Sequence, residues 1–388
     1  MTLLRSLNPH ALQAPESGIV AVVNHGRGRE GLIPLWVGEG DLATPDFISN
    51  AATESLRQGE TFYTWQRGIP ELRQALAVYH AGLFDVPADP ERYFVTGSGM
   101  QAIRIAIDAL APAGSEIVYL DPAWPNFAAA LTIAGSHPVA VPLDHGDEGW
   151  TLDLNRLERA IGAKTRALFI NSPANPTGWV ASSEDLRAIL DLARRHGLWI
   201  IADEIYARFH YDGACAPSFH DVAEPDERIL YVNSFSKNWS MTGWRVGWIE
   251  APSVLGQTLE NLIQYATSGV APFMQRAAIA ALGLGEAFLG DQIERAGAAR
   301  DILCDALLAT NRVRLTKPAG AFYAFFAIDG LEDSRIAAFD IVDRCGVGLA
   351  PGSAFGLQGR GYLRACFHRR LDHVQIAAER LQDYVKSL

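Results

Sequence analysis

The 388-residue chain has few cysteines, no long apolar run and a deficit of positive charge. Its four cysteines, Cys215, Cys304, Cys345 and Cys366, are far apart, so neither the spacing of a zinc site nor that of a disulfide framework is present. No apolar run approaches the ~18 residues of a membrane-spanning helix, and the N-terminus lacks the apolar block of a signal peptide. A net charge of −11 disfavours nucleic acids and anionic membranes as partners, because both would repel the chain. These absences predict a cytoplasmic protein with reduced thiols.

Short apolar runs alternate with amphipathic segments from about residue 90 to residue 250. The strand-like runs are Tyr93–Thr96, Glu116–Leu120, His137–Pro142, Ala167–Asn171, Leu198–Asp203, Ile229–Asn233 and Val246–Glu250. The amphipathic segments between them include Gln101–Leu110, Asp153–Ile161 and Glu184–His196. This alternation predicts an α/β fold with a mostly parallel sheet that is flanked by helices.

The pattern changes after residue 250. Helical segments lead to a smaller α+β set, with strands expected at Val313–Thr316, Ala321–Ile328 and Gly361–Phe367, a helix near Ile336–Cys345 and a terminal helix. We therefore expect a large domain over residues 46–290. A small domain is expected to combine residues 291–388 with residues 1–45.

The stretch Ser234-Phe235-Ser236-Lys237, followed by Arg245, has the groups that bind a phosphorylated aldehyde. A lysine amine condenses with an aldehyde to form a Schiff base, while serine hydroxyls and a guanidinium bind phosphate. Pyridoxal phosphate (PLP) combines these two chemical groups. An isolated Ser-x-Ser-Lys is more often a polar loop that faces water, so the hypothesis depends on the rest of the chain.

Further polar candidates follow the predicted strands, and the carboxyl ends of strands are where open α/β sheets bind ligands. Asp203 ends one strand and can pair with a pyridinium nitrogen. Asn175 lies in a loop with two prolines and a glycine that can aim its amide at a ring hydroxyl, and Tyr206 can donate a proton to the same hydroxyl. A solvent-facing aspartate and a plain turn are the ordinary alternatives.

Two more candidates suit the phosphate and the ring. Gly99 and Met100, in Gly97-Ser98-Gly99-Met100, lie between a strand and a helix, where backbone N–H groups and the helix dipole favour a phosphate. Trp124 follows the next strand and can stack on a pyridine ring, although a core or interface role is equally common for a tryptophan.

Together these residues resemble the class I/II aminotransferase family of fold type I PLP enzymes, the aspartate aminotransferase superfamily. The similarity extends from Val37-Gly38-Glu39-Gly40-Asp41 to Arg364. Its most specific parts are the stretch from Ser234 to Lys237 with Met241-Thr242-Gly243-Trp244-Arg245, and the loop Asn175-Pro176-Thr177-Gly178.

The resemblance implies a ping-pong transfer of an amino group between an L-amino acid and a 2-oxo acid, with PLP as cofactor and without a metal. Lys237 would form the internal aldimine and then act as general base and acid. The implied cofactor ligands are Gly99, Met100, Ser234, Ser236 and Arg245 for the phosphate and Asp203, Asn175, Tyr206 and Trp124 for the ring. Gly38, Asn175 and Arg364 would bind the substrate carboxylate, and Tyr63 would reach the partner's phosphate across a homodimer interface.

Three alternatives stay open at this point. A PLP-dependent β-lyase, such as a carbon–sulfur lyase, would use the same cofactor residues. Gly97-x-Gly99-x-x-Ala102, with Asp121 about 20 residues further on, also fits a dinucleotide fingerprint of an NAD-dependent dehydrogenase. A non-catalytic PLP-sensing regulator is disfavoured, because the acidic chain begins almost directly with the enzyme pattern.

The substrate side chain is not determined by the sequence. Arg67 and Arg27 are candidates for a second carboxylate. Trp36, Trp65 and Trp124, with Tyr63 and Phe355, could form an aromatic pocket, although aromatic residues are also ordinary core or interface residues.

Overall fold

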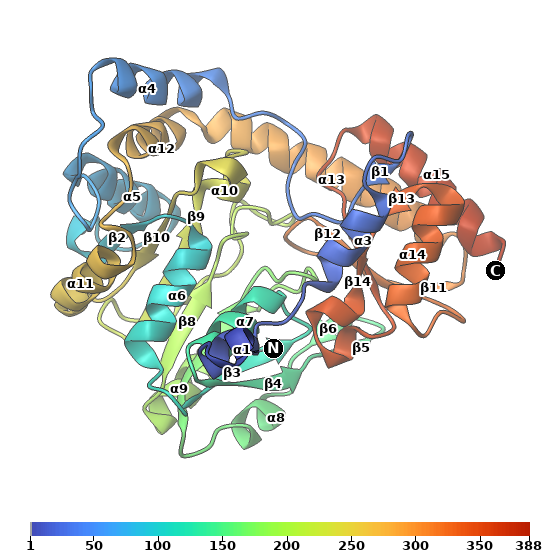
Figure 1. Cartoon of the computed structure of the whole chain (residues 1–388), viewed down its shortest axis with the longest axis horizontal. Coiled ribbons are helices and arrows are strands. Elements are labelled where there is room, and N and C mark those ends of the chain that lie inside the picture. The colour runs from blue at the N-terminus through green and yellow to red at the C-terminus, as the bar shows by residue number, and fades with distance from the viewer. Residues whose placement is uncertain (1) are drawn as a thin grey trace.

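The computed structural model describes residues 2–388, and its largest element is a seven-stranded sheet (Figure 1). The strands, in spatial order, are β2 (Tyr93–Thr96), β10 (Gly247–Glu250), β9 (Ile229–Ser234), β8 (Trp199–Asp203), β7 (Thr165–Asn171), β3 (Glu116–Asp121) and β4 (His137–Pro142). All neighbours from β9 to β4 are parallel, and only β10 runs antiparallel, to both β9 and β2. The predicted α/β fold with a mostly parallel sheet is confirmed.

Helices cover both faces of this sheet because its strands are apolar on both sides. Leu168 and Ile200 pack in one apolar core with α8 and α9, while Phe169 and Ile201 pack in another with α6, α7 and α11. The bounds of these helices are α6 (Gly99–Leu110), α7 (Pro125–Ile133), α8 (Leu154–Arg159), α9 (Ser183–His196) and α11 (Gly256–Thr267). Successive residues of a strand point to opposite faces, so adjacent positions enter different cores.

Helix α9 shows how local sequence sets an element's limits. Ser182 accepts a hydrogen bond from Asp185 N at 3.0 Å, and Asp185 Oδ2 accepts one from Ser182 N at 3.0 Å, which together form a capping box. Gly197 ends the helix in the left-handed conformation, with φ at 65°. The predicted helix Glu184–His196 is thus confirmed with its start and stop.

A second, four-stranded sheet lies beside the first, among the orange and red helices of Figure 1. Its strands, in order, are β11 (Val313–Arg314), β12 (Tyr323–Ile328), β15 (Leu363–Cys366) and β14 (Ala350–Pro351), all antiparallel to their neighbours. The surrounding helices are α3 (Gly18–Gly26), α13 (Glu286–Leu308), α14 (Ser334–Cys345) and α15 (Leu371–Lys386). The N-terminal strand β1 (Ile33–Pro34) pairs with β13 (Val347–Gly348), which ties the N-terminal segment to the C-terminal part of the chain.

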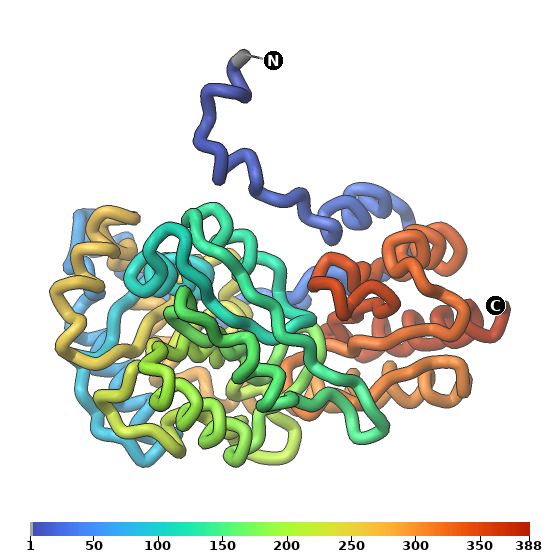
Figure 2. Tube along the Cα trace, turned by 90° about the horizontal axis from the view of Figure 1, so that it is seen from below, coloured from blue at the N-terminus to red at the C-terminus, as the bar shows by residue number. Residues whose placement is uncertain are grey.

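A boundary between two domains stays a prediction. The expected position near residue 290 falls inside the continuous helix α13. The remaining α-helices are α1 (Thr2–Arg5), α2 (Pro9–Leu12), α4 (Asp46–Arg57), α5 (Pro70–Leu83), α10 (Phe235–Asn238) and α12 (Pro272–Leu284), and the last two strands, β5 (Asp144–Gly146) and β6 (Gly149–Thr151), form a hairpin. Figure 2 shows the chain before α3 extending away from the body of the molecule, and all residues from 3 to 17 are exposed.

Within residues 2–388, no helix combines the length and the apolar character that a membrane crossing requires.

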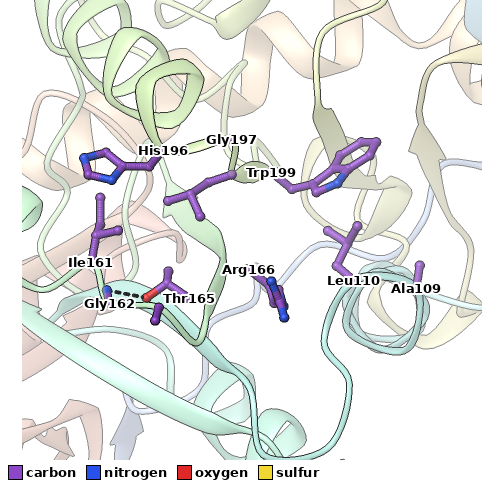
Figure 3. A pocket seen from close by; sticks show the side chains of 11 residues that line it. Ala109, Leu110, Ile161, Gly162, Thr165, Arg166, His196, Gly197 and Trp199 are labelled. Carbon is purple, nitrogen blue, oxygen red and sulfur yellow. Dashed lines mark hydrogen bonds between the residues drawn. The ribbon is translucent and has the colours of Figure 1, made fainter.

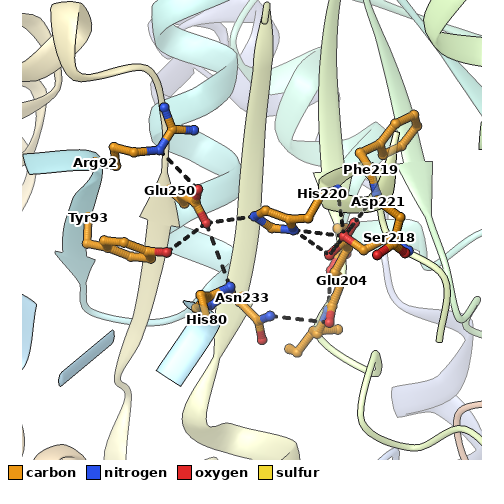
Figure 4. A network of polar contacts seen from close by, with 12 residues as sticks. His80, Arg92, Tyr93, Glu204, Ser218, Phe219, His220, Asp221, Asn233 and Glu250 are labelled. Carbon is orange, nitrogen blue, oxygen red and sulfur yellow. Dashed lines mark hydrogen bonds and ion pairs between the residues drawn. The ribbon is translucent and has the colours of Figure 1, made fainter. Parts of the chain in front are cut away.

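A buried cluster of polar and charged side chains surrounds Glu250 of β10 and includes Tyr93 of β2 and Glu204, the residue after β8 (Figure 4). Glu250 is only 2% exposed, and its carboxylate accepts hydrogen bonds from Arg92 Nε at 3.2 Å, Tyr93 Oη at 3.1 Å and His220 Nε2 at 2.9 Å. Burial alone would raise the pKa of Glu250, but His220, His80 and Arg92 hold it at about 2. Such a cluster is stable only while each charge keeps its partner.

The same cluster has three groups of the kind that bind metals. One atom each of His80, His220 and Glu250 lie within 4.8 Å of one another. The guanidinium of Arg92 already contacts Glu250 and would repel a metal cation. We therefore interpret the cluster as a structural ion-pair network.

We expect the Glu250→Gln substitution to lower the free energy of unfolding by about 3 kcal/mol at pH 7, because Arg92 and His220 lose their buried counter-charge. The pKa of Glu250 is lower in the folded protein, so this contribution is complete above the unfolded pKa and is lost as the pH falls towards 2. Urea unfolding of both proteins at a series of pH values measures it.

The matched control is Glu91→Gln, whose side chain is 57% exposed and also pairs with arginines. Its effect should stay below about 1 kcal/mol. Equal losses in the two variants would contradict the structural role of the buried network.

Candidate active site

A cavity of about 460 Å³ lies where the carboxyl ends of β8 and β9 meet the small sheet and helix α3. All but one of the residues predicted for the site line it: Gly38, Gly99, Met100, Trp124, Asn175, Asp203, Tyr206, Ser234, Ser236, Lys237, Arg245 and Arg364. The cavity also contains residues that the sequence did not indicate, among them Tyr323 and three apolar residues of α3.

Lys237 follows the end of β9 on the short helix α10. Ser234 caps this helix, since its hydroxyl accepts a hydrogen bond from Ser236 N at 3.1 Å. The Lys237 ammonium donates to the carbonyl oxygen of Gly38 at 2.7 Å. Burial lowers the pKa of Lys237 to about 8, and the charges of Arg364 and Arg245 act in the same direction. A usable share of the amine is therefore neutral near physiological pH.

Asp203 is the last residue of β8 and is 6% exposed. Burial raises the pKa of its carboxyl to about 7, which Lys237 only partly offsets. Its Oδ1 accepts one hydrogen bond, from Ile205 N at 3.3 Å, and no side chain among residues 2–388 forms an ion pair with it. A protonated ring nitrogen would supply the missing positive charge, so this buried carboxylate fits PLP.

Another part of the cavity lining suits a phosphate. Gly99 and Met100 form the first turn of the twelve-residue helix α6, whose N-cap Ser98 accepts a hydrogen bond from Gln101 N at 3.0 Å. A Cβ atom at Gly99 would come within 3.3 Å of the Ser234 Cβ, so glycine keeps this corner open. Unpaired N–H groups at a helix start, two hydroxyls and the Arg245 guanidinium form a donor set for an anion.

Arg364, on β15, is 2% exposed and lies between two aromatic rings. Its guanidinium carbon is 4.6 Å from the ring centroid of Tyr323 and 4.7 Å from that of Phe355. Nη1 donates to Asn175 Oδ1 at 3.0 Å and Nη2 donates to the carbonyl of Trp36, while Nε has no partner among residues 2–388. The Arg364 guanidinium is therefore buried, held in place by the Tyr323 and Phe355 rings, and left with one N–H free to donate. This arrangement fits a carboxylate ligand.

Tyr323 is a site residue that sequence reasoning missed. Its hydroxyl is hydrogen bonded to that of Tyr206 at 2.7 Å. The pKa of Tyr206 is well above its usual value because of burial and the neighbouring Tyr323, so Tyr206 keeps its proton. A Cβ atom at Gly38 would lie 2.2 Å from Tyr323 Oη, which explains why position 38 requires glycine. No local pattern links Tyr323, on β12, to Tyr206.

Other candidates lie away from the cavity. Tyr63 is 92% exposed and borders a separate hollow of about 370 Å³ together with Phe62. Arg67 pairs with Glu91 and Glu260 at 3.0 and 2.8 Å, and Arg27 is exposed at the end of α3. Trp65 is half-exposed and does not line the cavity, whereas Trp36 and Trp124 do.

A larger hollow of about 620 Å³ lies at the amino ends of β7 and β8 (Figure 3). Thr165 and Trp199, which begin these strands, help to line it. Its titratable side chains, Arg166 and His196, are exposed. None of the predicted site residues lies there, so this hollow has no part in the proposed chemistry.

The sheet order excludes the dinucleotide interpretation. A nucleotide-binding βαβ unit places its two parallel strands close together at the switch point of the sheet. Here β2 is an edge strand that pairs only with the antiparallel β10, and β10, β9, β8 and β7 separate it from β3. Asp121, the expected ribose ligand, accepts a hydrogen bond from Gln358 N at 3.1 Å instead.

Comparison with known proteins agrees with this geometry. The family model for aminotransferase class I and II matches residues 30–381. An aspartate aminotransferase of Pyrococcus abyssi is 33% identical over 92% of this chain and 93% of its own. The aromatic-amino-acid aminotransferase 2 of Thermococcus litoralis is 34% identical over 93% of each chain. The structure of Thermus thermophilus aspartate aminotransferase with maleate superposes with a TM-score of 0.91 at 32% identity, over 98% of this chain and 99% of its own.

The chain belongs to the class I and II aminotransferase family. It is an aminotransferase of the fold type I class and uses PLP as its cofactor.

We expect the apoenzyme to react with PLP faster as the pH rises, with the rate constant levelling off above about pH 8. The reason is that a lowered Lys237 pKa makes the neutral, nucleophilic amine available at lower pH. Stopped-flow absorbance during reconstitution measures the rate. The control is Nα-acetyl-lysine, whose side-chain amine is free and exposed to water. Its rate of reaction with PLP should keep rising towards pH ~10.4. An apoenzyme profile that follows the control would contradict a desolvated Lys237.

Proposed function

We propose that the enzyme moves an amino group from an L-amino acid to a 2-oxo acid by a ping-pong mechanism centred on Lys237. The observation that carries this proposal is the shared cavity of three groups: a desolvated amine at Lys237, a buried unpaired carboxylate at Asp203 and a fixed guanidinium at Arg364.

When bound, PLP supplies an aldehyde for the amino group and a ring that withdraws electrons from the substrate α-carbon. Asp203 binds the ring nitrogen, and Asn175 and Tyr206 bind the ring hydroxyl. Trp124 contacts the ring face. The phosphate ligands are Gly99, Met100, Ser234, Ser236 and Arg245.

Arg364 binds the substrate α-carboxylate through its planar fork, near the Gly38 backbone and the Asn175 amide. This contact fixes the orientation of the substrate Cα–H bond. Lys237 Nζ, held near Gly38, takes the proton from Cα as general base and later returns a proton as general acid. A pKa of about 8 suits both directions, because neither the neutral nor the charged amine is rare near pH 7.5.

We propose that Tyr63 acts in a homodimer, where it contacts the phosphate site of the partner subunit. The side chains of Tyr63 and Phe62 are 92% and 82% exposed, an uncommon state for two adjacent aromatic residues. A partner subunit would cover them and receive the Tyr63 hydroxyl at its phosphate site. We further propose that the chain has two domains, residues 46–290 and residues 1–45 with 291–388, and that each domain supplies part of the cavity. We propose a cytoplasmic location for the enzyme.

We expect Lys237→Ala to abolish turnover with every amino acid while PLP still binds through Asp203 and the phosphate ligands. Steady-state assays together with equilibrium dialysis of PLP measure the two effects. The matched control is Lys317→Ala, since Lys317 pairs with Asp301 and Asp305 outside the cavity. Near-normal turnover by Lys237→Ala would refute the role assigned to Lys237.

The unaltered enzyme distinguishes the two reaction types. Release of pyruvate and ammonia without amino transfer would favour a β-lyase.

We expect Arg364→Lys to lower kcat/KM for amino acids by about 30- to 100-fold, because an ammonium lacks the planar fork for a carboxylate. The reference is an amine donor without a carboxylate, which gains nothing from the fork. Its kcat/KM should change little. An equal loss for the amine and for the amino acids would show that Arg364 does not recognise the carboxylate.

A further inference from the structure

Helix α3 forms an apolar wall of the active-site cavity. Ile19, Val20 and Val23 of this helix line the cavity, and Trp36 lies beside them in the lining. Ile19 and Val23 also pack against the apolar core that contains Trp36 and Tyr323. The helix is thus anchored to the small sheet, while part of its apolar face remains open to a ligand.

The position of α3 places this wall at the end where a substrate binds. Helix α3 packs on β14, and Ala350 of β14 pairs directly with Arg364 of β15. The proposed phosphate ligands Gly99 and Ser234 lie on the large sheet and its helix α6. An amino acid whose carboxylate is bound by Arg364 therefore lies near α3.

The charges of the cavity leave no cation for a second carboxylate. Among residues 2–388, its cationic lining residues are Lys237, Arg245 and Arg364, and each has a role in the proposed function. Arg67 and Arg27, the other candidates, lie elsewhere. A side-chain carboxylate at this wall would lose its water without gaining a partner, which is unfavourable.

We infer, on the basis of the proposed function, that α3 forms a subsite for an apolar substrate side chain, aliphatic or aromatic. Ile19, Val20 and Val23 then determine specificity against aspartate and glutamate. Similarity alone does not decide this point, because relatives named for aspartate and for aromatic amino acids resemble the chain equally well.

The test compares kcat/KM of the holoenzyme for L-leucine, L-phenylalanine, L-aspartate and L-glutamate with one fixed acceptor. The better apolar substrate should exceed both acidic ones by about tenfold or more. A preference for aspartate or glutamate would overturn the inference, and a cation supplied by a partner subunit would be its explanation. The proposed function would remain intact in that case.

A binding measurement separates the two claims further. Thermal unfolding of the holoenzyme is followed with 3-phenylpropionate and with maleate, neither of which can donate an amino group. A larger rise in Tm with 3-phenylpropionate supports the apolar subsite even if no amino acid is converted, in which case only the proposed function fails. A larger rise with maleate overturns the subsite.

A charge placed on α3 tests the specific residues. Val20 is 51% exposed, so Val20→Arg can carry its guanidinium to the cavity without entering the core. The ratio of kcat/KM for leucine to that for aspartate should fall at least about tenfold. The control is Asn24→Arg, which adds the same charge to an exposed position of α3 outside the lining. An unchanged ratio in Val20→Arg, or an equal fall in both variants, would contradict a direct contact with the substrate side chain.

Discussion

Desolvation of the Lys237 amine is the constraint on which the rest of the active site depends. The amine lies in a cavity formed by three distant parts of the chain, and burial lowers its pKa to about 8. Its hydrogen bond to the Gly38 carbonyl links the N-terminal segment to the end of β9. Because Tyr323 occupies the space beside Gly38, this link requires a glycine and a close fit of the small sheet.

The cavity contains an acid and a base whose pKa values are displaced towards each other. Burial raises the pKa of Asp203 to about 7 and lowers that of Lys237 to about 8, so both groups lack full compensation within the chain. A cofactor with a basic ring nitrogen, an aldehyde and a phosphate complements this arrangement. The buried network around Glu250, in contrast, has its charges paired internally and needs no ligand.

The sequence predicted the sheet and most of the site because both depend on local signals. In β7 and β8 an apolar run is followed by a polar last residue, Asn171 and Asp203, and these two residues are paired at one sheet edge. The site residues that were missed depend on long-range packing. Tyr323 reaches Tyr206 from another sheet, and α3 reaches the cavity through contacts with β14. The hairpin of β5 and β6 was also missed, because its strands are short and partly exposed.

The most direct test of the central claim locates the covalent bond between PLP and the protein. Reduction of the holoenzyme with sodium borohydride makes the link between the cofactor and its lysine permanent, and mass spectrometry of a proteolytic digest identifies the modified residue. The chain has only four lysines, Lys164, Lys237, Lys317 and Lys386, so the assignment is unambiguous. The account predicts a pyridoxyl group on Lys237 alone. Modification of another lysine, or of none, would contradict it.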